Sequence, residues 1–203
     1  MFRRIGYKLG DGGMWLLSHL PLGGLYPFGF AMYGLLYYVV RYRRKVVMKN
    51  LAESFPEKTR EELRETAKDF YLNFADYMVE TIRLGGMSER EIRSRITYED
   101  LDIVERYLEE KRPVVAYFSH CFKWEWVTSL GVVADVEGSE RSQVYRPLKS
   151  KWMDAYMLRI RERFGARCYA KATVFRELLR RRKEGITTFT GFMSDQKPSH
   201  NDP

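Results

Sequence analysis

The chain of 203 residues has few cysteines, and this shortage limits the chemistry it can carry. Its two cysteines, Cys121 and Cys168, are too few for a disulfide framework, and neither belongs to a CxxC metal-ligand pair. We therefore expect two small, half-buried side chains in a reducing compartment, with no metal site and no cofactor. Repeats and low-complexity tracts are also absent, and 45% of the residues are hydrophobic, which excludes a disordered tail.

Charge is missing from Gly12 to Val40, a run of 29 residues in a chain of which 31% is charged. A single helix of that length would reach about 43 Å, longer than the hydrocarbon core of a bilayer at about 30 Å. Helix-breaking residues interrupt the middle of the run, namely Pro21, Gly23, Gly24, Pro27 and Gly29. We therefore expect two apolar segments, roughly 14–20 and 28–40.

Both flanks of the uncharged run are basic. Arg3, Arg4 and Lys8 precede it, and it is followed by Arg41, Arg43, Arg44, Lys45 and Lys49. It lacks the small-residue cleavage site of a signal peptide, so we expect it to be retained. Residues 1–50 are predicted to form a helical membrane anchor that either lies in the membrane–water interface or forms a re-entrant segment in the bilayer. Its basic flanks would contact anionic lipid headgroups. The alternative is a buried helical hairpin of a soluble domain.

Residues 51–203 have the pattern of an α/β domain. Capping signals at Thr59-x-x-Glu62 and Ser88-x-x-Glu91 predict a long helix to about Leu84 and then a short one, with Gly85 and Gly86 between them. Strand-like segments at 113–119, 142–146, 166–170 and 186–193 alternate with helices at 101–110, 123–133, 152–164 and 174–182. This alternation is typical of a mixed, largely parallel sheet flanked by helices. Because the last strand has a central pattern and little follows it, we expect the C-terminal part of the domain to be missing.

His120 directly follows the first of these strands, at the carboxyl edge where open α/β sheets place their sites. Glu125 comes five residues later, and a turn between them could fold its carboxylate onto the imidazole. Such a pair can take a proton from an attacking hydroxyl while the carboxylate fixes the tautomer. Taken alone, this spacing is more often a satisfied loop pair. No G-x-S-x-G elbow is present, so a covalent acyl-enzyme is not indicated.

Other segments extend the pattern in a fixed order along nearly the whole chain. They are Arg44–Leu51, Ser54–Glu57, the SHxxxxE segment Ser119–Glu125, Val144–Pro147 and Gly191–Gln196. Together they resemble the late acyltransferases of lipid A biosynthesis, which are lysophospholipid-acyltransferase-like enzymes with an H-x4-D/E motif. The ordered set is far more specific than any single motif.

The resemblance implies a glycerolipid-acyltransferase-like fold and transfer of a fatty acyl group from acyl carrier protein to a hydroxyl of a lipid A precursor. It places this reaction at the cytoplasmic face of the bacterial inner membrane. It also implies that His120 is the general base and Glu125 its orienting partner. Arg146, followed by Pro147, would bind a phosphate or hold the polar acceptor. Further substrate-binding candidates are Tyr145, Lys149, Asp195 and Gln196, the last two of which could equally cap a helix.

Residues 141–183 are strongly basic, with 14 lysines and arginines against three acidic residues. They could face an acidic carrier protein, a phosphorylated lipid or an anionic membrane. No nucleic-acid reader motif is present, so we expect no nucleic-acid partner. Two other functions stay open: a glycerolipid acyltransferase, which would use the same dyad, and a truncated, non-catalytic lipid-binding protein.

Overall fold

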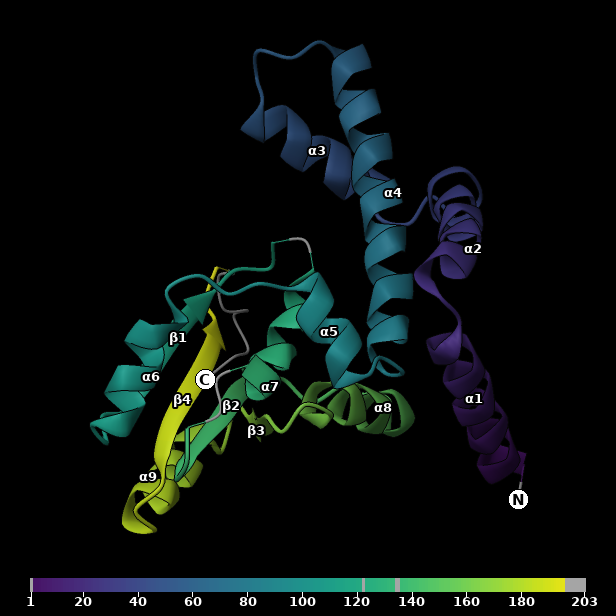
Figure 1. Ribbon diagram of the computed structural model, residues 1–203. Helices are drawn as coiled ribbons and strands as arrows, with labels where there is room; N and C mark the ends of the chain where they lie inside the picture. Colours follow the sequence, from purple (N-terminus) through teal and green to yellow (C-terminus); the bar gives the residue numbers. More distant parts are fainter. Residues whose placement is uncertain (1, 122, 134–135, 196–203) are drawn as a thin grey trace. The chain divides into compact units, whose positions relative to one another are not determined.

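The computed structural model describes residues 2–121, 123–133 and 136–195 (Figure 1). The chain divides into two compact units, and each is described separately. One unit is helical and consists of Gly12–Gly86, and the other consists of Met1–Asp11 together with Met87–Pro203. The first helix, α1 (Phe2–His19), contributes its beginning to the second unit and its end to the helical unit.

The helical unit is built around the long helix α4, and α2 packs against part of it (Figure 1). Its elements after α1 are α2 (Leu22–Gly34), the π-helix η1 (Leu35–Val39), α3 (Arg44–Ser54) and α4 (Arg60–Leu84). Gly29 permits the close approach of α2, because a Cβ there would lie 3.1 Å from the Asp76 carboxylate and 3.4 Å from Val79. Tyr37 and Tyr71 are buried in the small core of this unit.

The helix ends in this region follow the predicted capping signals. The Glu62 amide donates to the Thr59 hydroxyl at 3.3 Å, and the Thr59 amide donates to the Glu62 carboxylate at 2.7 Å, which forms a capping box. The helix α4 ends at Leu84, before Gly85, as predicted. Ser88 then caps α5 (Glu89–Arg95) by accepting from the Glu91 amide at 3.2 Å.

The uncharged run breaks after the first predicted segment, as expected, but the break is shorter than predicted. It is interrupted at Leu20 and Pro21, and α2 then continues straight through Pro27. Proline inside a helix removes one hydrogen bond, and here the packing of Leu25 and Gly29 against α4 offsets that loss. Among the residues that the structure describes, no helix is both long enough and apolar enough to cross a membrane.

The second unit contains a four-stranded sheet in which all neighbouring strands are parallel. The strands are β1 (Val114–Phe118), β2 (Ser139–Tyr145), β3 (Arg167–Ala170) and β4 (Thr187–Met193). Their order is β1-β4-β2-β3, so the last strand is central, as its sequence predicted. The expected α/β architecture with a parallel sheet is confirmed.

Helices flank this sheet at nearly the predicted positions. They are α5, α6 (Leu101–Glu109), the 3-10 helix η2 (Trp124–Ser129), α7 (Leu130–Val133), α8 (Lys151–Glu162) and α9 (Val174–Lys183). The predicted helix at 123–133 is largely 3-10, since the Thr128 and Ser129 hydroxyls donate to the carbonyls of Glu125 and Trp126. One core cluster joins Leu108, Leu130 and Phe189 between the sheet and these helices.

The strand register brings the carboxyl ends of all four strands to one edge. Phe118 of β1 lies opposite Met193 of β4, and Tyr145 of β2 lies opposite Ala170 of β3. The Ser194 amide donates to the Phe118 carbonyl at 3.0 Å, which extends the β1–β4 pairing beyond the strand ends. Residues that immediately follow these strands therefore gather at the same edge.

Candidate active site

His120 and Asp195 form the best-defined polar pair at the carboxyl edge of the sheet. Nδ1 of His120 lies 2.7 Å from Oδ1 of Asp195, and the backbone amide of His120 donates to Oδ2 at 2.8 Å. Each residue comes two positions after a pair of registered strand ends, Phe118 and Met193. The single carboxylate therefore fixes both the backbone and the ring of the histidine.

This pairing leaves the imidazole with one ring nitrogen directed elsewhere. Nε2 of His120 makes no hydrogen bond to any residue within the described ranges, and the side chain is 31% exposed. The Trp124 ring meets the imidazole edge-on, with 5.3 Å between ring centroids. Hydrogen bonds from the His120 ring and backbone hold the pKa of Asp195 below its usual range, so this carboxylate is ionised at neutral pH.

Glu125 lies on η2 and contacts α8 rather than the histidine. Nε of Arg161 donates to its Oε2 at 2.8 Å and Nη2 donates to its Oε1 at 2.5 Å. Both carboxylate oxygens are thus engaged, and the side chain is only 4% exposed. The expected hydrogen bond between Glu125 and His120 is not formed among the described residues, because the guanidinium fork satisfies the carboxylate. The catalytic roles of both residues stay predictions.

The remaining predicted site residues lie along the same edge or just beyond it. Tyr145 ends β2 and is half-buried, and this burial raises the pKa of its hydroxyl. Arg146 follows it and is exposed, as is Lys149 in the connection to α8. Gln196 lies outside the described residues. The edge thus combines a histidine–carboxylate pair with cationic side chains two strands away.

Part of the basic block from 141 to 183 serves internal packing rather than the surface. Besides Arg161, Arg163 donates to the Met87 carbonyl at 2.9 Å and Arg181 pairs with Glu140 at 2.9 Å. Arg181 is only 12% exposed. The surface available to an anionic partner is therefore smaller than the count of basic residues indicates.

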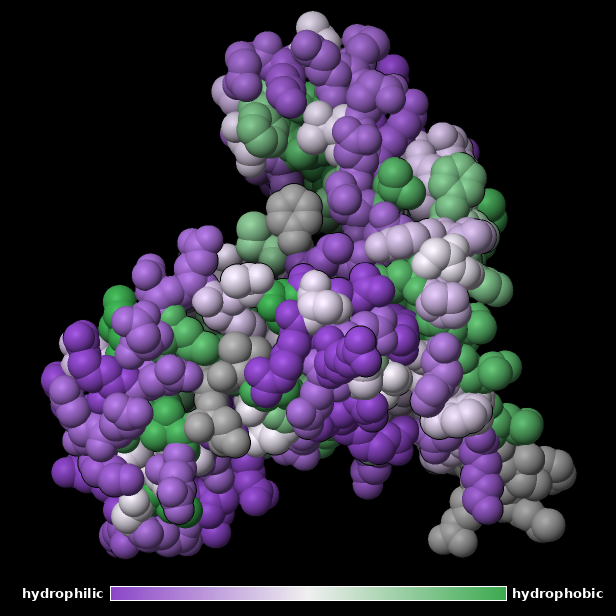
Figure 2. Space-filling view, viewed as in Figure 1, coloured by the Kyte–Doolittle hydropathy of each residue, from purple (hydrophilic) through white to green (hydrophobic). Residues whose placement is uncertain are grey.

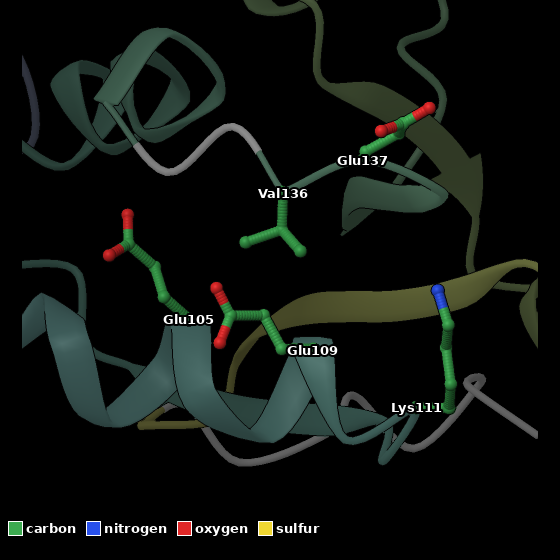
Figure 3. Close-up of a pocket in the computed structure, with 5 residues that line it drawn as sticks. All are labelled: Glu105, Glu109, Lys111, Val136 and Glu137. Carbon is green, nitrogen blue, oxygen red and sulfur yellow. The ribbon is translucent and has the colours of Figure 1, made fainter.

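A hollow with acidic walls lies at the opposite edge of the sheet (Figure 3). Figure 3 shows Glu105 and Glu109 rising from α6, with Val136 and Glu137 across from them and Lys111 beyond the helix end. Lys111 precedes β1 and Glu137 precedes β2, which places the hollow at the amino ends of these strands. Within the described residues, no group of three or more histidine, cysteine, aspartate or glutamate side chains could hold a metal ion.

Sequence reasoning named Asp195 as a substrate-binding candidate and did not pair it with His120. A usable signal was present, because Asp195 follows the last strand at the same interval at which His120 follows the first. That signal required knowing that β1 and β4 are neighbours. The sequence places Arg161 only among the basic residues of 141–183. No local motif predicts its ion pair with Glu125.

Residues 1–202 match the family model described as bacterial lipid A biosynthesis acyltransferase. The match covers nearly the whole chain, so it includes the helical unit as well as the sheet and its carboxyl edge. No curated protein matches the chain. The resemblance drawn from the ordered sequence motifs is confirmed.

Proposed function

The chain belongs to the bacterial lipid A biosynthesis acyltransferase family, and from this we propose a specific reaction at the His120 edge. The reaction is transfer of a fatty acyl group from the thioester of acyl carrier protein to a hydroxyl of a lipid A precursor. The observation that supports it is the hydrogen bond between His120 and Asp195 at the carboxyl edge of a parallel sheet.

In the proposed mechanism, Nε2 of His120 takes the proton from the acceptor hydroxyl as its oxygen attacks the thioester carbonyl carbon. The C–S bond then breaks, and the departing thiolate takes the proton from the imidazolium. Asp195 stays ionised throughout, fixes the ring through Nδ1 and stabilises its positive charge. No bond to the protein is formed, which agrees with the lack of a nucleophile elbow.

Glu125 is proposed to position other parts of the site and not to take part in proton transfer. Its carboxylate bonds to Arg161 of α8, and it lies in the segment that immediately follows His120. The ion pair therefore connects η2, which follows His120, to α8, the helix that follows Arg146. We assign Glu125 as a positioning residue that maintains the geometry between these two parts of the edge.

We also propose that the helical unit associates with the cytoplasmic face of the bacterial inner membrane. Apolar side chains are exposed on α1 and α2, including Trp15 at 63%, Phe28 at 55% and Phe30 at 65% (Figure 2). Arg41 and Arg43, which follow η1, are exposed as well. Apolar and aromatic side chains beside arginines suit an interface with anionic lipid headgroups.

The function is tested by measuring transfer of a labelled acyl chain from acyl carrier protein to a lipid A precursor in detergent. His120→Ala is expected to lower kcat about 10²- to 10⁴-fold, the usual contribution of a general base. Asp195→Asn is expected to lower it substantially at every pH in the neutral range. This follows because the hydrogen bonds from His120 lower the pKa of Asp195, which keeps its carboxylate charged throughout the neutral range.

Matched controls are His19→Ala and Asp102→Asn, which change the same residue types away from the carboxyl edge. Both should retain wild-type transfer. Wild-type kcat in the His120→Ala protein would remove this histidine from the mechanism. Transfer to lysophosphatidate in preference to the lipid A precursor would instead assign the enzyme to glycerolipid synthesis.

A further inference from the structure

We propose that the outward side of α9 is the docking surface for the acidic acyl carrier protein that brings the acyl chain. This surface, the α9 face, consists of Phe175, Arg176, Leu179, Arg182 and Lys183. The inference rests on the proposed function, because it assumes that the donor is a thioester of acyl carrier protein. It adds the place at which the body of that protein binds.

The opposite side of α9 packs on the sheet and fixes the orientation of the helix. Val174 is only 2% exposed. Arg181 is 12% exposed and pairs with Glu140 of β2 at 2.9 Å. The helix also contacts β3 and β4 (Figure 1). Because these contacts prevent rotation of α9 about its axis, the α9 face is held toward solvent.

Leu179 lies at the centre of the α9 face. On a helix, the surface neighbours of a residue are those three and four positions away. For Leu179 the neighbours before it are Phe175 and Arg176, and those after it are Arg182 and Lys183. Phe175 is 75% exposed and Leu179 is 59% exposed, and the three basic residues are exposed as well. Two apolar side chains are therefore bordered by three cations.

The positive charges of the α9 face are not neutralised within the protein. The three cations pair with no acidic side chain in the part of the chain that the structure describes. Arg180 and Arg181, in contrast, pair with Glu177 at 2.6 Å and with Glu140 at 2.9 Å. Such a surface attracts a strongly acidic protein, and its apolar centre supplies a dry contact. A membrane-bound helix needs a broader apolar side, so two apolar side chains favour a protein partner.

The stability of the helix does not explain Arg176. It is the third residue of α9, in the first turn, where a positive charge opposes the helix dipole. Arg182 and Lys183 lie in the last turn, where the dipole favours positive charge. The unfavourable position of Arg176, beside the exposed Phe175, therefore favours a role in binding.

The position of α9 suits delivery of a thioester to His120. β3 ends at Ala170 and α9 begins at Val174, so the first turn of the helix lies near the carboxyl edge. β3 is three positions from β1 in the sheet, which gives a lateral separation of about 14 Å at about 4.8 Å per strand. The thioester is carried on a long, flexible phosphopantetheine arm, so the carrier can bind at this distance from the reacting carbon.

The test measures binding of acyl carrier protein, loaded with a fatty acyl thioester, to the full chain in detergent. The His120→Ala background prevents turnover during the measurement. Arg176→Glu and Leu179→Ser are each expected to weaken binding about tenfold. Arg176→Glu should leave the melting temperature unchanged or raise it, because a glutamate in the first turn complements the dipole. A folding defect would therefore not account for the loss.

The matched control is Arg90→Glu, which replaces an exposed arginine in the first turn of α5 and should not alter binding. In the active chain, Arg176→Glu should raise the KM for the loaded carrier about tenfold at unchanged kcat, because the α9 face does not touch the reacting atoms.

Three results would overturn the docking surface: no binding of the carrier to the wild-type chain, wild-type binding by both α9 variants, or an equal loss in Arg90→Glu. Weaker flotation of the α9 variants with anionic vesicles, with carrier binding unchanged, would assign the α9 face to the membrane and overturn it as well. If the wild-type chain transfers no acyl group but carrier binding still depends on Arg176, the proposed function fails and the docking surface stands.

Discussion

Replacing Glu125 by glutamine removes the negative charge from a buried ion pair while preserving the shape of the side chain. Glu125 accepts hydrogen bonds from Nε and Nη2 of Arg161, and the two side chains are 4% and 20% exposed. The amide of glutamine offers only one acceptor oxygen, so one N–H of the guanidinium faces an NH₂ group. The variant therefore removes the Glu125 charge from beside a largely buried cation.

The expected cost follows from this burial. Removing one partner of a buried ion pair costs about 3–5 kcal/mol. Because Arg161 keeps partial access to water and glutamine retains one acceptor, we expect a value near the lower limit, about 3 kcal/mol. For a chain of this length each kcal/mol lowers the melting temperature by about 2–4 °C, which predicts a decrease of about 6–12 °C.

Thermal unfolding followed by circular dichroism measures this change, and a double-mutant cycle with Arg161→Gln isolates the pair. In the Glu125→Gln background, Arg161→Gln should cost less than about 1 kcal/mol, because it removes the guanidinium charge that Glu125→Gln left in a largely buried position. Glu110→Gln is the control: its pair with Arg112 is long, at 3.5 Å, and exposed. It should change stability by less than about 0.5 kcal/mol.

The result that would refute the reasoning is an unchanged melting temperature of Glu125→Gln together with a loss of acyl transfer. It would mean that the carboxylate acts on the reaction and not on the position of α8. Loss of both properties, with partial recovery of transfer in the Glu125→Gln/Arg161→Gln protein, would support the positioning role.

Two further predictions concern the surface of the chain. An alkylating reagent at neutral pH should label Cys121 rapidly and Cys168 slowly, since Cys121 is exposed whereas burial raises the pKa of Cys168 to about 11; mass spectrometry of the peptides measures both rates. Equal rates would contradict the burial of Cys168. The chain should float with vesicles that contain anionic phospholipid, and Phe28→Ser with Phe30→Ser should weaken this at least several-fold; no change would remove α2 from the membrane surface.

Local sequence signals predicted most of the elements because the forces that fix them act over a few residues. The Thr59–Glu62 capping box is complete within one turn of helix. The apolar residues before His120 favour a strand whichever strand lies next to them. One local prediction was wrong, and a second was confirmed in position but not in helix type. Pro27 stays helical because α2 packs on α4, and 124–129 becomes a 3-10 helix because its hydroxyls bond the backbone carbonyls.

The partner of His120 could not be predicted in the same way, because two carboxylates are candidates. One is close to His120 in sequence, and the other is brought close only by the pairing of strands. Glu125 is five residues away in sequence, but the intervening turn and η2 carry it to Arg161. Asp195 is 75 residues away, and only the pairing of β1 with β4 brings it within 2.7 Å. Sequence spacing favours the first carboxylate and sheet order selects the second. A search for the partner of a histidine at a strand end should therefore begin with residues that follow the neighbouring strands at the same interval.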